Sequence, residues 1–267
     1  MAFFKERSLT SHKGENGRVL VVGGSENYVG APALAAMAAL RSGIDICVVA
    51  APEKVAWQIN SYSPDIITRK INGDFLNWDN VNEIVKLAET FDCVLIGNGL
   101  GTEPGTMDFV REAVERISIP LVIDADAIKA LAGKKISNSI ITPHAREFEI
   151  WTGESLPKEL DDKARVAQMF AKNKSVVLLK GPIDIIASED ELKFNKTGNP
   201  GMTIGGTGDV LAGITAGFLA QTKDLFNSAY YAAYLNGKIG DYLLKKKGIG
   251  FTASDIVELI PLFRRKI

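Results

Sequence analysis

The residues with the clearest chemistry lie in a glycine-rich loop that ends at Asp209. The loop contains five glycines within eleven residues: Gly198, Gly201, Gly205, Gly206 and Gly208. An apolar run over residues 210–220 follows Asp209 and predicts a buried helix. A glycine loop that enters a helix presents free backbone N–H groups and the positive end of the helix dipole, which together bind anions such as phosphate. The Asp209 carboxylate would lie beside that anion, where it can act as a base.

A second interpretation of Asp209 is that it only caps the helix, a role that aspartate fills well. Capping alone would not require so many glycines, so the stretch favours a phosphate-binding loop. The predicted anion loop is formed by Gly205, Gly206, Thr207 and Gly208.

Other polar side chains follow directly after predicted buried strands, where open α/β sheets bind ligands. Asp124 and Asp126 follow the strand predicted at 119–123, His144 follows 139–142, and Lys180 ends 175–180. For Asp126 a helix cap is favoured, whereas Asp124 fits a cap or a metal ligand equally. His144 fits a structural or a ligand-binding role equally. Lys180 could neutralise a nucleotide phosphate or simply be solvated.

The spacing of apolar residues and the positions of glycines predict strands that alternate with helices. Strands are expected at 18–22, 44–50, 66–69, 92–96, 119–123, 139–142 and 175–180, with a hairpin at 184–187 and 192–195. Helices are expected at 31–41, 52–61, 79–90, 105–117, 127–131, 147–151, 159–173, 210–220, 225–247 and 252–260. This alternation predicts an α/β fold with a mostly parallel central sheet and one ligand crevice. Because no linker or repeat interrupts it, residues 1–267 are expected to form a single domain.

Composition narrows the class of protein. The net charge of −1 argues against nucleic-acid or anionic-membrane partners. Cys47 and Cys93 lie in apolar runs, as expected of buried, reduced cysteines in a reducing compartment. No apolar run approaches the roughly 20 residues of a membrane span, and the N-terminus lacks the apolar core of a signal peptide. The chain is therefore expected to be soluble and cytoplasmic.

Several motifs, taken in order, resemble one family. They are Tyr28-Val29-Gly30-Ala31-Pro32, Gly97-Asn98-Gly99-Leu100-Gly101, Asp124-Ala125-Asp126-Ala127, Thr142-Pro143-His144, Leu179-Lys180-Gly181, and Thr197-Gly198-Asn199-Pro200-Gly201 with Gly205-Gly206-Thr207-Gly208-Asp209. Together they resemble the prokaryotic ADP-dependent NAD(P)H-hydrate dehydratases over about residues 13–260. That family has a three-layer, ribokinase-like fold with a central, mostly parallel sheet flanked by helices.

The resemblance implies a hydro-lyase that repairs nicotinamide nucleotides, returning the S epimer of hydrated NADH or NADPH to NAD(P)H while ADP becomes AMP and phosphate. Asp209 would be the catalytic base. The implied hydrate site is Ala31, Gly99, His144 and Asp209. The implied AMP site is Lys180, Gly181, Pro182, Ile183, Asp184 and Gly208. Mg²⁺ would bridge the phosphates without a dedicated set of protein ligands. The implied assembly is a homo-oligomer, and the family often forms homo-tetramers.

Two positions depart from the family pattern. Asn98 stands where the family usually has proline, and Arg146 stands where it usually has glycine. Asn98 could alter the rigidity of its loop, and Arg146 could reach a ligand phosphate such as that of NADPH hydrate. An epimerase domain, which many relatives carry before the dehydratase, would not fit in the residues that precede Lys13, so the dehydratase alone is expected.

Two other functions remain open from the residues themselves. One is a kinase of the same fold that phosphorylates a vitamin precursor such as hydroxyethylthiazole and stops at the phosphate ester. The other is a nucleotide-binding regulatory protein, which would have no need of the base Asp209.

Overall fold

The computed structural model describes residues 3–4 and 7–266 of the chain. In this part of the chain nine strands form a sheet in the order β3-β2-β1-β4-β5-β6-β7-β8-β9. The strands are β1 (Arg18–Val22), β2 (Ile46–Pro52), β3 (Ile67–Ile71), β4 (Cys93–Ile96), β5 (Leu121–Ile123), β6 (Ser139–Ile141), β7 (Val176–Leu179), β8 (Asp184–Ala187) and β9 (Leu192–Asn195). Strands β1 to β7 are parallel to one another, whereas β8 and β9 form an antiparallel hairpin at one edge. The predicted mostly parallel sheet and the hairpin are therefore confirmed.

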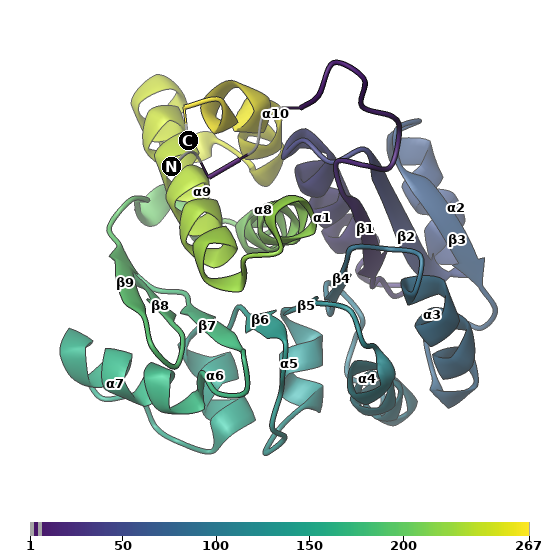
Figure 1. The fold of residues 1–267 in the computed structure, drawn as a ribbon, viewed down its shortest axis with the longest axis horizontal. Coiled ribbons are helices and arrows are strands. Elements are labelled where there is room, and N and C mark those ends of the chain that lie inside the picture. The colour runs from purple at the N-terminus through teal and green to yellow at the C-terminus, as the bar shows by residue number, and fades with distance from the viewer. Residues whose placement is uncertain (1–2, 5–6, 267) are drawn as a thin grey trace.

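Helices cover both faces of the sheet (Figure 1). One face carries α1 (Gly30–Arg41), α2 (Glu53–Tyr62), α8 (Thr207–Thr222), α9 (Leu225–Lys247) and α10 (Ala253–Arg264). The other face carries α3 (Val81–Ala88), α4 (Pro104–Arg116), α5 (Asp126–Ala130), α6 (Ala145–Thr152) and α7 (Leu160–Phe170). Short 3₁₀ turns occur at η1 (Trp78–Asn80), η2 (Pro200–Thr203) and η3 (Gly248–Gly250). The result is the expected three-layer α/β architecture.

The central strands explain why both faces need helices. Along β1, Val19 and Val21 belong to the core beneath α1 and α8, whereas Leu20 and Val22 belong to the core on the opposite face. Successive side chains of a strand point to opposite faces, so a continuous apolar strand is stable only where both faces are buried.

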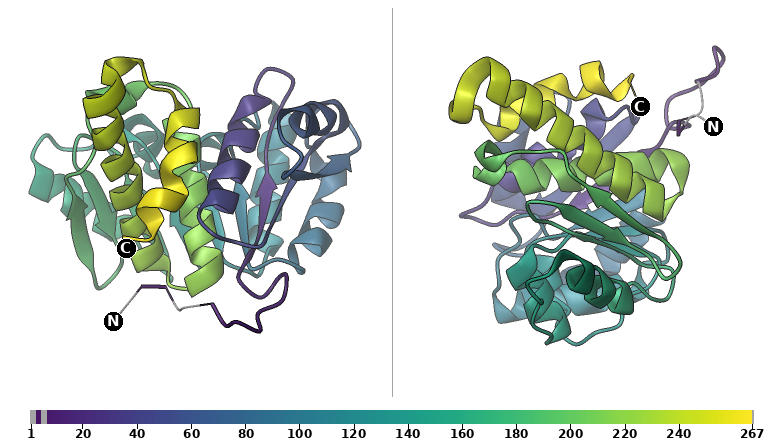
Figure 2. Two further views of the ribbon diagram at one scale, coloured as in Figure 1. Left: turned by 90° about the horizontal axis from the view of Figure 1, so that it is seen from above. Right: turned by 90° about the vertical axis from the view of Figure 1, so that its left-hand side faces the viewer.

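Helices α1 and α8 approach each other unusually closely within the layer formed by α1, α8, α9 and α10 (Figure 2). A Cβ atom on Gly213 would lie 2.1 Å from the carbonyl oxygen of Ala35. A Cβ atom on Gly217 would lie 1.9 Å from Oγ of Ser42. Glycine is therefore required at both positions for this packing.

The main differences from the predicted elements lie at element ends. The predicted strand 44–50 begins at Ile46 and extends to Pro52. The predicted helix 79–90 is divided into η1 and α3, because the side chain of Asn77 accepts from the backbone N–H of Asp79 and starts a separate 3₁₀ turn. None of the helices described combines the length and the apolar character needed to cross a bilayer.

Candidate active site

The parallel strands bring the candidate residues together at the carboxyl ends of the strands. Asn98 lies just beyond β4, Asp124 directly follows β5, and Lys180 directly follows β7. Because these strands run in the same direction, their carboxyl ends meet along one side, and the start of α8 lies against that side. The structure thus brings together groups that are more than 80 residues apart in the sequence.

Helix α8 begins earlier than the sequence predicted, at Thr207 rather than at residue 210. Its N-cap is Gly206, whose φ of +94° is readily adopted only by glycine. No side chain caps this end of α8, and the first N–H groups of a helix lack acceptors within the helix. The start of α8 therefore presents free donors and a positive dipole end, as an anion site requires.

Asp209 is not a helix cap. It lies inside the first turn of α8, and its Oδ1 accepts a hydrogen bond of 2.7 Å from Nδ2 of Asn98. Burial raises the pKa of Asp209 to about 6; repulsion from Asp124 acts in the same direction, and the Asn98 hydrogen bond opposes it. A carboxylate with a pKa near 6 is ionised at neutral pH and is a stronger base than an ordinary aspartate.

Asp124 is engaged on several sides. It is 2% exposed and accepts from Oγ1 of Thr142 at 2.7 Å, from Nζ of Lys180 at 2.9 Å and from Nδ2 of Asn98 at 3.0 Å. The sequence left the role of Asp124 open between a helix cap and a metal ligand. In the structure these hydrogen bonds hold the surrounding polar side chains in place.

Lys180 is not a solvated lysine. Its side chain is only 20% exposed, and Nζ lies 2.9 Å from Asp124 and 3.8 Å from Glu147. Burial of the ammonium opposes its charge, but the two carboxylates outweigh this effect and raise the pKa of Lys180 above its ordinary value. A Cβ atom on Gly208 would lie 3.7 Å from Nζ, so the lysine charge adjoins the first turn of α8.

The expected cap role of Asp126 is wrong. The N-cap of α5 is Ala125, at φ +51°, and no side chain caps that helix. Instead, Asp126 accepts from the backbone N–H of Gly101 at 2.9 Å and from Nζ of Lys129 at 2.7 Å. Asp126 thus fastens the loop of residues 97–101 to the start of α5.

His144 has a structural role that the sequence left open. Its Nδ1 accepts from the backbone N–H of Glu147, and the Glu147 carboxylate accepts from the backbone N–H of His144, which together form a capping box at the start of α6. The side chain of His144 is nevertheless 53% exposed. Capping therefore does not exclude contact with a ligand.

A cleft of about 530 Å³ opens beside the start of α8. Its size lies within the range of ligand pockets. It is lined by Lys180, Gly181, Pro182, Asp184, Thr197, Gly198, Asn199, Pro200, Met202, Thr203, Thr207, Gly208, Leu211, Ala233, Asn236 and Gly237. Of the residues expected to hold AMP, all but Ile183 line this cleft. Within the cleft, burial raises the pKa of Asp184, which accepts hydrogen bonds from Asn195 and from the backbone N–H of Gly181.

Two residues expected to bind the hydrate lie together outside this cleft. A Cβ atom on Gly99 would lie 3.2 Å from Cβ of Ala31 and 2.8 Å from Tyr28, and Gly99 has a φ of +69°. The neighbouring Asn98 contacts Asp209, so Gly99 and Ala31 lie close to the candidate base. Asp209 also directly follows Gly208, which lines the cleft. Of the anion loop, Thr207 and Gly208 line the cleft, and Gly205 and Gly206 do not.

Sequence reasoning missed three polar residues of the site. Asn98 attracted notice only as a departure from a family pattern, and its contact with Asp209 was not foreseen. Glu147, which is 5% exposed and neighbours Lys180, gave no signal. Asn236 lines the cleft from the middle of α9, where a polar residue in a long helix is unremarkable.

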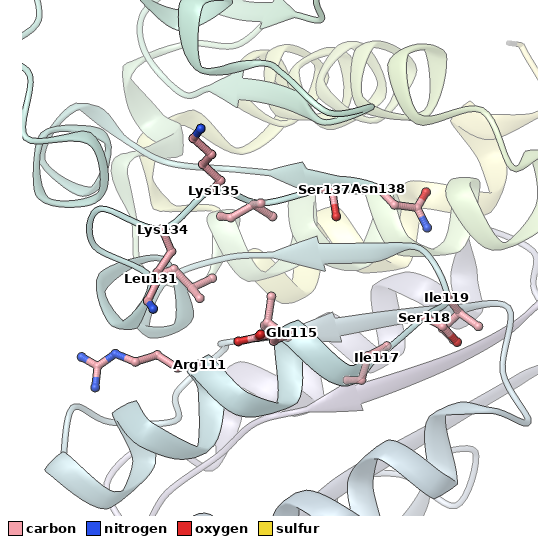
Figure 3. Close-up of a pocket in the computed structure, with 12 residues that line it drawn as sticks. Arg111, Glu115, Ile117, Ser118, Ile119, Leu131, Lys134, Lys135, Ser137 and Asn138 are labelled. Carbon is pink, nitrogen blue, oxygen red and sulfur yellow. The ribbon is translucent and has the colours of Figure 1, made fainter.

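A second cleft, of about 520 Å³, lies at the amino ends of β5 and β6, the ends opposite the candidate site (Figure 3). It is formed by α4, by the loop after α5 and by the residues that precede β5 and β6, among them Ile119 and Asn138. The side chains of Arg111 and Lys135 point away from each other rather than toward a common ligand. None of the residues with predicted roles lines this cleft.

The carboxylates of the site are dispersed rather than grouped around a common point. Within the described residues, no three His, Cys, Asp or Glu side chains are grouped in a way that could hold a metal. Asp124 accepts two hydrogen bonds at Oδ1 and one at Oδ2, which uses most of its acceptor sites. An ion held mainly by phosphate oxygens and water is compatible with this site.

Comparisons with known proteins agree with this geometry. A protein-family model described as NAD(P)H-hydrate dehydratase matches residues 19–262. A bifunctional NAD(P)H-hydrate repair enzyme from Pyrobaculum aerophilum is 44% identical over 264 residues, which cover 97% of this chain and 53% of the relative. The chain thus spans about half the length of that relative.

Two further proteins match over most of their length. An ADP-dependent (S)-NAD(P)H-hydrate dehydratase from Cenarchaeum symbiosum is 37% identical, with 97% of this chain and 92% of the relative covered. The crystal structure of an ADP/ATP-dependent NAD(P)H-hydrate dehydratase from Bacillus subtilis, co-crystallised with ATP and Mg²⁺, is 28% identical, with a TM-score of 0.84 over 98% of this chain and 93% of that chain.

Proposed function

The chain belongs to the NAD(P)H-hydrate dehydratase family, which has the ribokinase-like fold, and we propose that it repairs hydrated nicotinamide nucleotides. In this reaction the S epimer of hydrated NADH or NADPH returns to NAD(P)H while ADP is cleaved to AMP and phosphate. The observation that carries the proposal is the connection of Asp209 to both groups: it directly follows Gly208, which lines the cleft, and it accepts a hydrogen bond from Asn98, the residue before Gly99. A base connected in this way to both groups can take a proton from one ligand while the other donates a phosphoryl group.

Each part of the site has a role in this proposal. Asp209 takes the proton of the ring hydroxyl, whose oxygen then bonds to the β-phosphorus of ADP as the bond to AMP breaks. The N–H groups at the start of α8 stabilise the charge on the transferring phosphoryl group. The C–O bond of the new phosphate ester then breaks, and loss of a proton from the adjacent ring carbon restores the double bond.

The two ligands would occupy different sides of Asp209. The ADP side is the 530 Å³ cleft, with Lys180, Gly181, Pro182, Ile183, Asp184 and Gly208 at the AMP portion. The hydrate side is Ala31, Gly99 and His144. Mg²⁺, carried by the phosphates, would neutralise part of their charge, and no side chain is assigned to it as a ligand.

The organisation of the protein is proposed on the same basis. The single continuous sheet supports residues 1–267 acting as one dehydratase domain. The resemblance favours a homo-oligomer, and the family often forms homo-tetramers; light scattering of the purified protein would test the assembly. Two buried free thiols, Cys47 and Cys93, are compatible with a reducing, cytoplasmic location, since burial raises the pKa of both and keeps them unreactive.

One assay tests the function directly. The purified protein is incubated with Mg²⁺ and NADH hydrate together with ADP, with ATP or with no nucleotide. We expect the absorbance of the reduced nicotinamide to return with a nucleotide present and AMP to form from ADP. A stable phosphorylated product with no regained absorbance would instead indicate a kinase, and nucleotide binding without turnover of either kind would indicate a regulatory protein.

A further inference from the structure

A buried amide lies between two carboxylates at the candidate site. Asn98 is fully buried, and its Nδ2 donates to Oδ1 of Asp209 at 2.7 Å and to Oδ2 of Asp124 at 3.0 Å. An amide nitrogen carries two N–H donors, so each carboxylate receives one. The two acidic side chains are therefore joined by a neutral group that donates to both.

The chemistry of the amide fixes its orientation. The reverse orientation would place Oδ1 of Asn98 against two carboxylate oxygens, where it could only repel them. In the observed orientation Oδ1 is buried and has no hydrogen-bond partner among the described residues. An unsatisfied buried oxygen is costly and uncommon in folded proteins, and such exceptions often mark functional sites.

The Asn98 hydrogen bond is also the principal direct support for the charge of Asp209. Within the described part of the chain, no other side chain donates a hydrogen bond to Asp209. The charged groups that act on it are Asp124 and Asp126, which repel it, and Lys180, which attracts it. Lys180 is shared with two other carboxylates, at 2.9 and 3.8 Å, so much of its charge is already compensated.

We propose that Asn98 is a positioning residue for the reaction: it holds the Asp209 carboxylate in the orientation and the ionised state that a base requires. This inference rests on the proposed function, in which Asp209 takes the proton of the substrate hydroxyl. Removal of the amide would favour the protonated acid, because the repulsion from the two neighbouring aspartates would then be opposed only by Lys180, whose charge is shared with two other carboxylates. A protonated Asp209 cannot act as a base.

The test is the pH dependence of kcat/KM for NADH hydrate between pH 5 and 9, in the wild-type protein, Asn98→Ala and Asn98→Leu. The acid limb of this pH profile reflects the ionisation of Asp209. Loss of a hydrogen bond to a charged group should move that limb upward by about one pH unit. Such a move lowers the ionised fraction of Asp209 at pH 6 by about fivefold and has little effect at pH 9. The deficit of both variants should therefore be largest at acid pH and should shrink as the pH rises.

Asn80→Ala is the matched control. Asn80 is also a buried asparagine, 6% exposed, with its amide hydrogen-bonded to backbone groups near η1, and it does not contact the site. We expect Asn80→Ala to lower stability without moving the acid limb. Circular dichroism shows whether each variant folds. If an Asn98 variant does not fold, Asn98→Ser takes its place. Because serine retains a small hydrogen-bond donor, the shift of the acid limb should then be smaller than one pH unit.

A second readout does not depend on turnover. Titration of the Asp209 carboxyl carbon by NMR, assigned with Asp209→Asn, should give a higher pKa in the Asn98 variants than in the wild-type protein. A pH-independent loss of activity together with an unchanged Asp209 titration would overturn the inference and leave the proposed function intact. If the wild-type protein does not turn over the hydrate, the proposed function fails, and the titration still decides whether Asn98 supports the charge of Asp209.

Discussion

Asp209→Asn is expected to abolish the proposed activity and at the same time to stabilise the fold. The neutral amide cannot take a proton, so turnover should fall by roughly a hundredfold or more, as is usual when a general base is removed. The amide oxygen can still accept the hydrogen bond from Asn98, so the local contact survives. What disappears is the free-energy cost of a charge that is largely buried.

The size of this stabilisation follows from the pKa of Asp209. The value is about 6 in the folded protein, against an ordinary 3.8. Since each pKa unit corresponds to about 1.4 kcal/mol, the difference amounts to roughly 3 kcal/mol at neutral pH. The folded state binds the proton more tightly than the unfolded state, so the stability that Asp209 contributes is lost as the pH rises from about 4 to 6.

Urea unfolding of the wild-type protein and Asp209→Asn at pH 4, 5, 6 and 7 measures this effect. The advantage of the variant should be small at pH 4, grow through pH 5 and 6, and level off near pH 7. Asp255→Asn provides a control of opposite sign, because hydrogen bonds from Lys247 and from the backbone N–H of Thr252 lower the pKa of Asp255, and its ionised form therefore stabilises the fold at neutral pH. If Asp209→Asn were less stable than the wild-type protein at pH 7, Asp209 would be a structural residue and the reasoning would be refuted.

Three further substitutions test other parts of the site. Lys180→Met leaves two buried carboxylates without their cation, so it should lower the free energy of unfolding by about 3–5 kcal/mol in urea titrations. The KM for ADP should rise. Unchanged stability would contradict the ion pairing. Gly99→Ala forces a Cβ atom to 2.8 Å from Tyr28 at positive φ, so it should lower the free energy of unfolding by about 1–3 kcal/mol and weaken hydrate binding. The control Gly133→Ala has a similar φ but open space around it, so it should lower the free energy of unfolding less and leave the kinetics unchanged. Arg146→Ala removes a side chain that is 77% exposed, so it should not affect folding, and it should reduce the preference for NADPH hydrate over NADH hydrate; an unchanged ratio of kcat/KM values would exclude a role for Arg146 in binding the extra phosphate.

The order of the strands and helices could be predicted because the signals are local. Apolar runs, helical periods and glycines after strands are read over a few residues, and they gave the parallel sheet and the β8–β9 hairpin. Element ends were less predictable. Gly206 starts α8 before the apolar run because its left-handed backbone turns the chain into the helix early, and a list of residue types does not reveal that angle.

The candidate site could be predicted only in part, and for a physical reason. Lys180, Asp184 and Gly208, which the resemblance placed at the AMP portion of ADP, line the cleft, and their roles in binding stay a prediction. The contact between Asn98 and Asp209 joins residues 111 positions apart, and no local pattern encodes it. The same limit applies to Asp126, whose proximity to a helix start suggested a cap, whereas its actual partner is the backbone of Gly101 in a distant loop.

The close contact between α1 and α8 has a consequence for motion. With Gly213 against the backbone of Ala35 and Gly217 against Ser42, the two helices are packed backbone to backbone, which resists sliding or rotation of one against the other. This packing favours a fixed separation between Ala31 near the start of α1 and Asp209 near the start of α8.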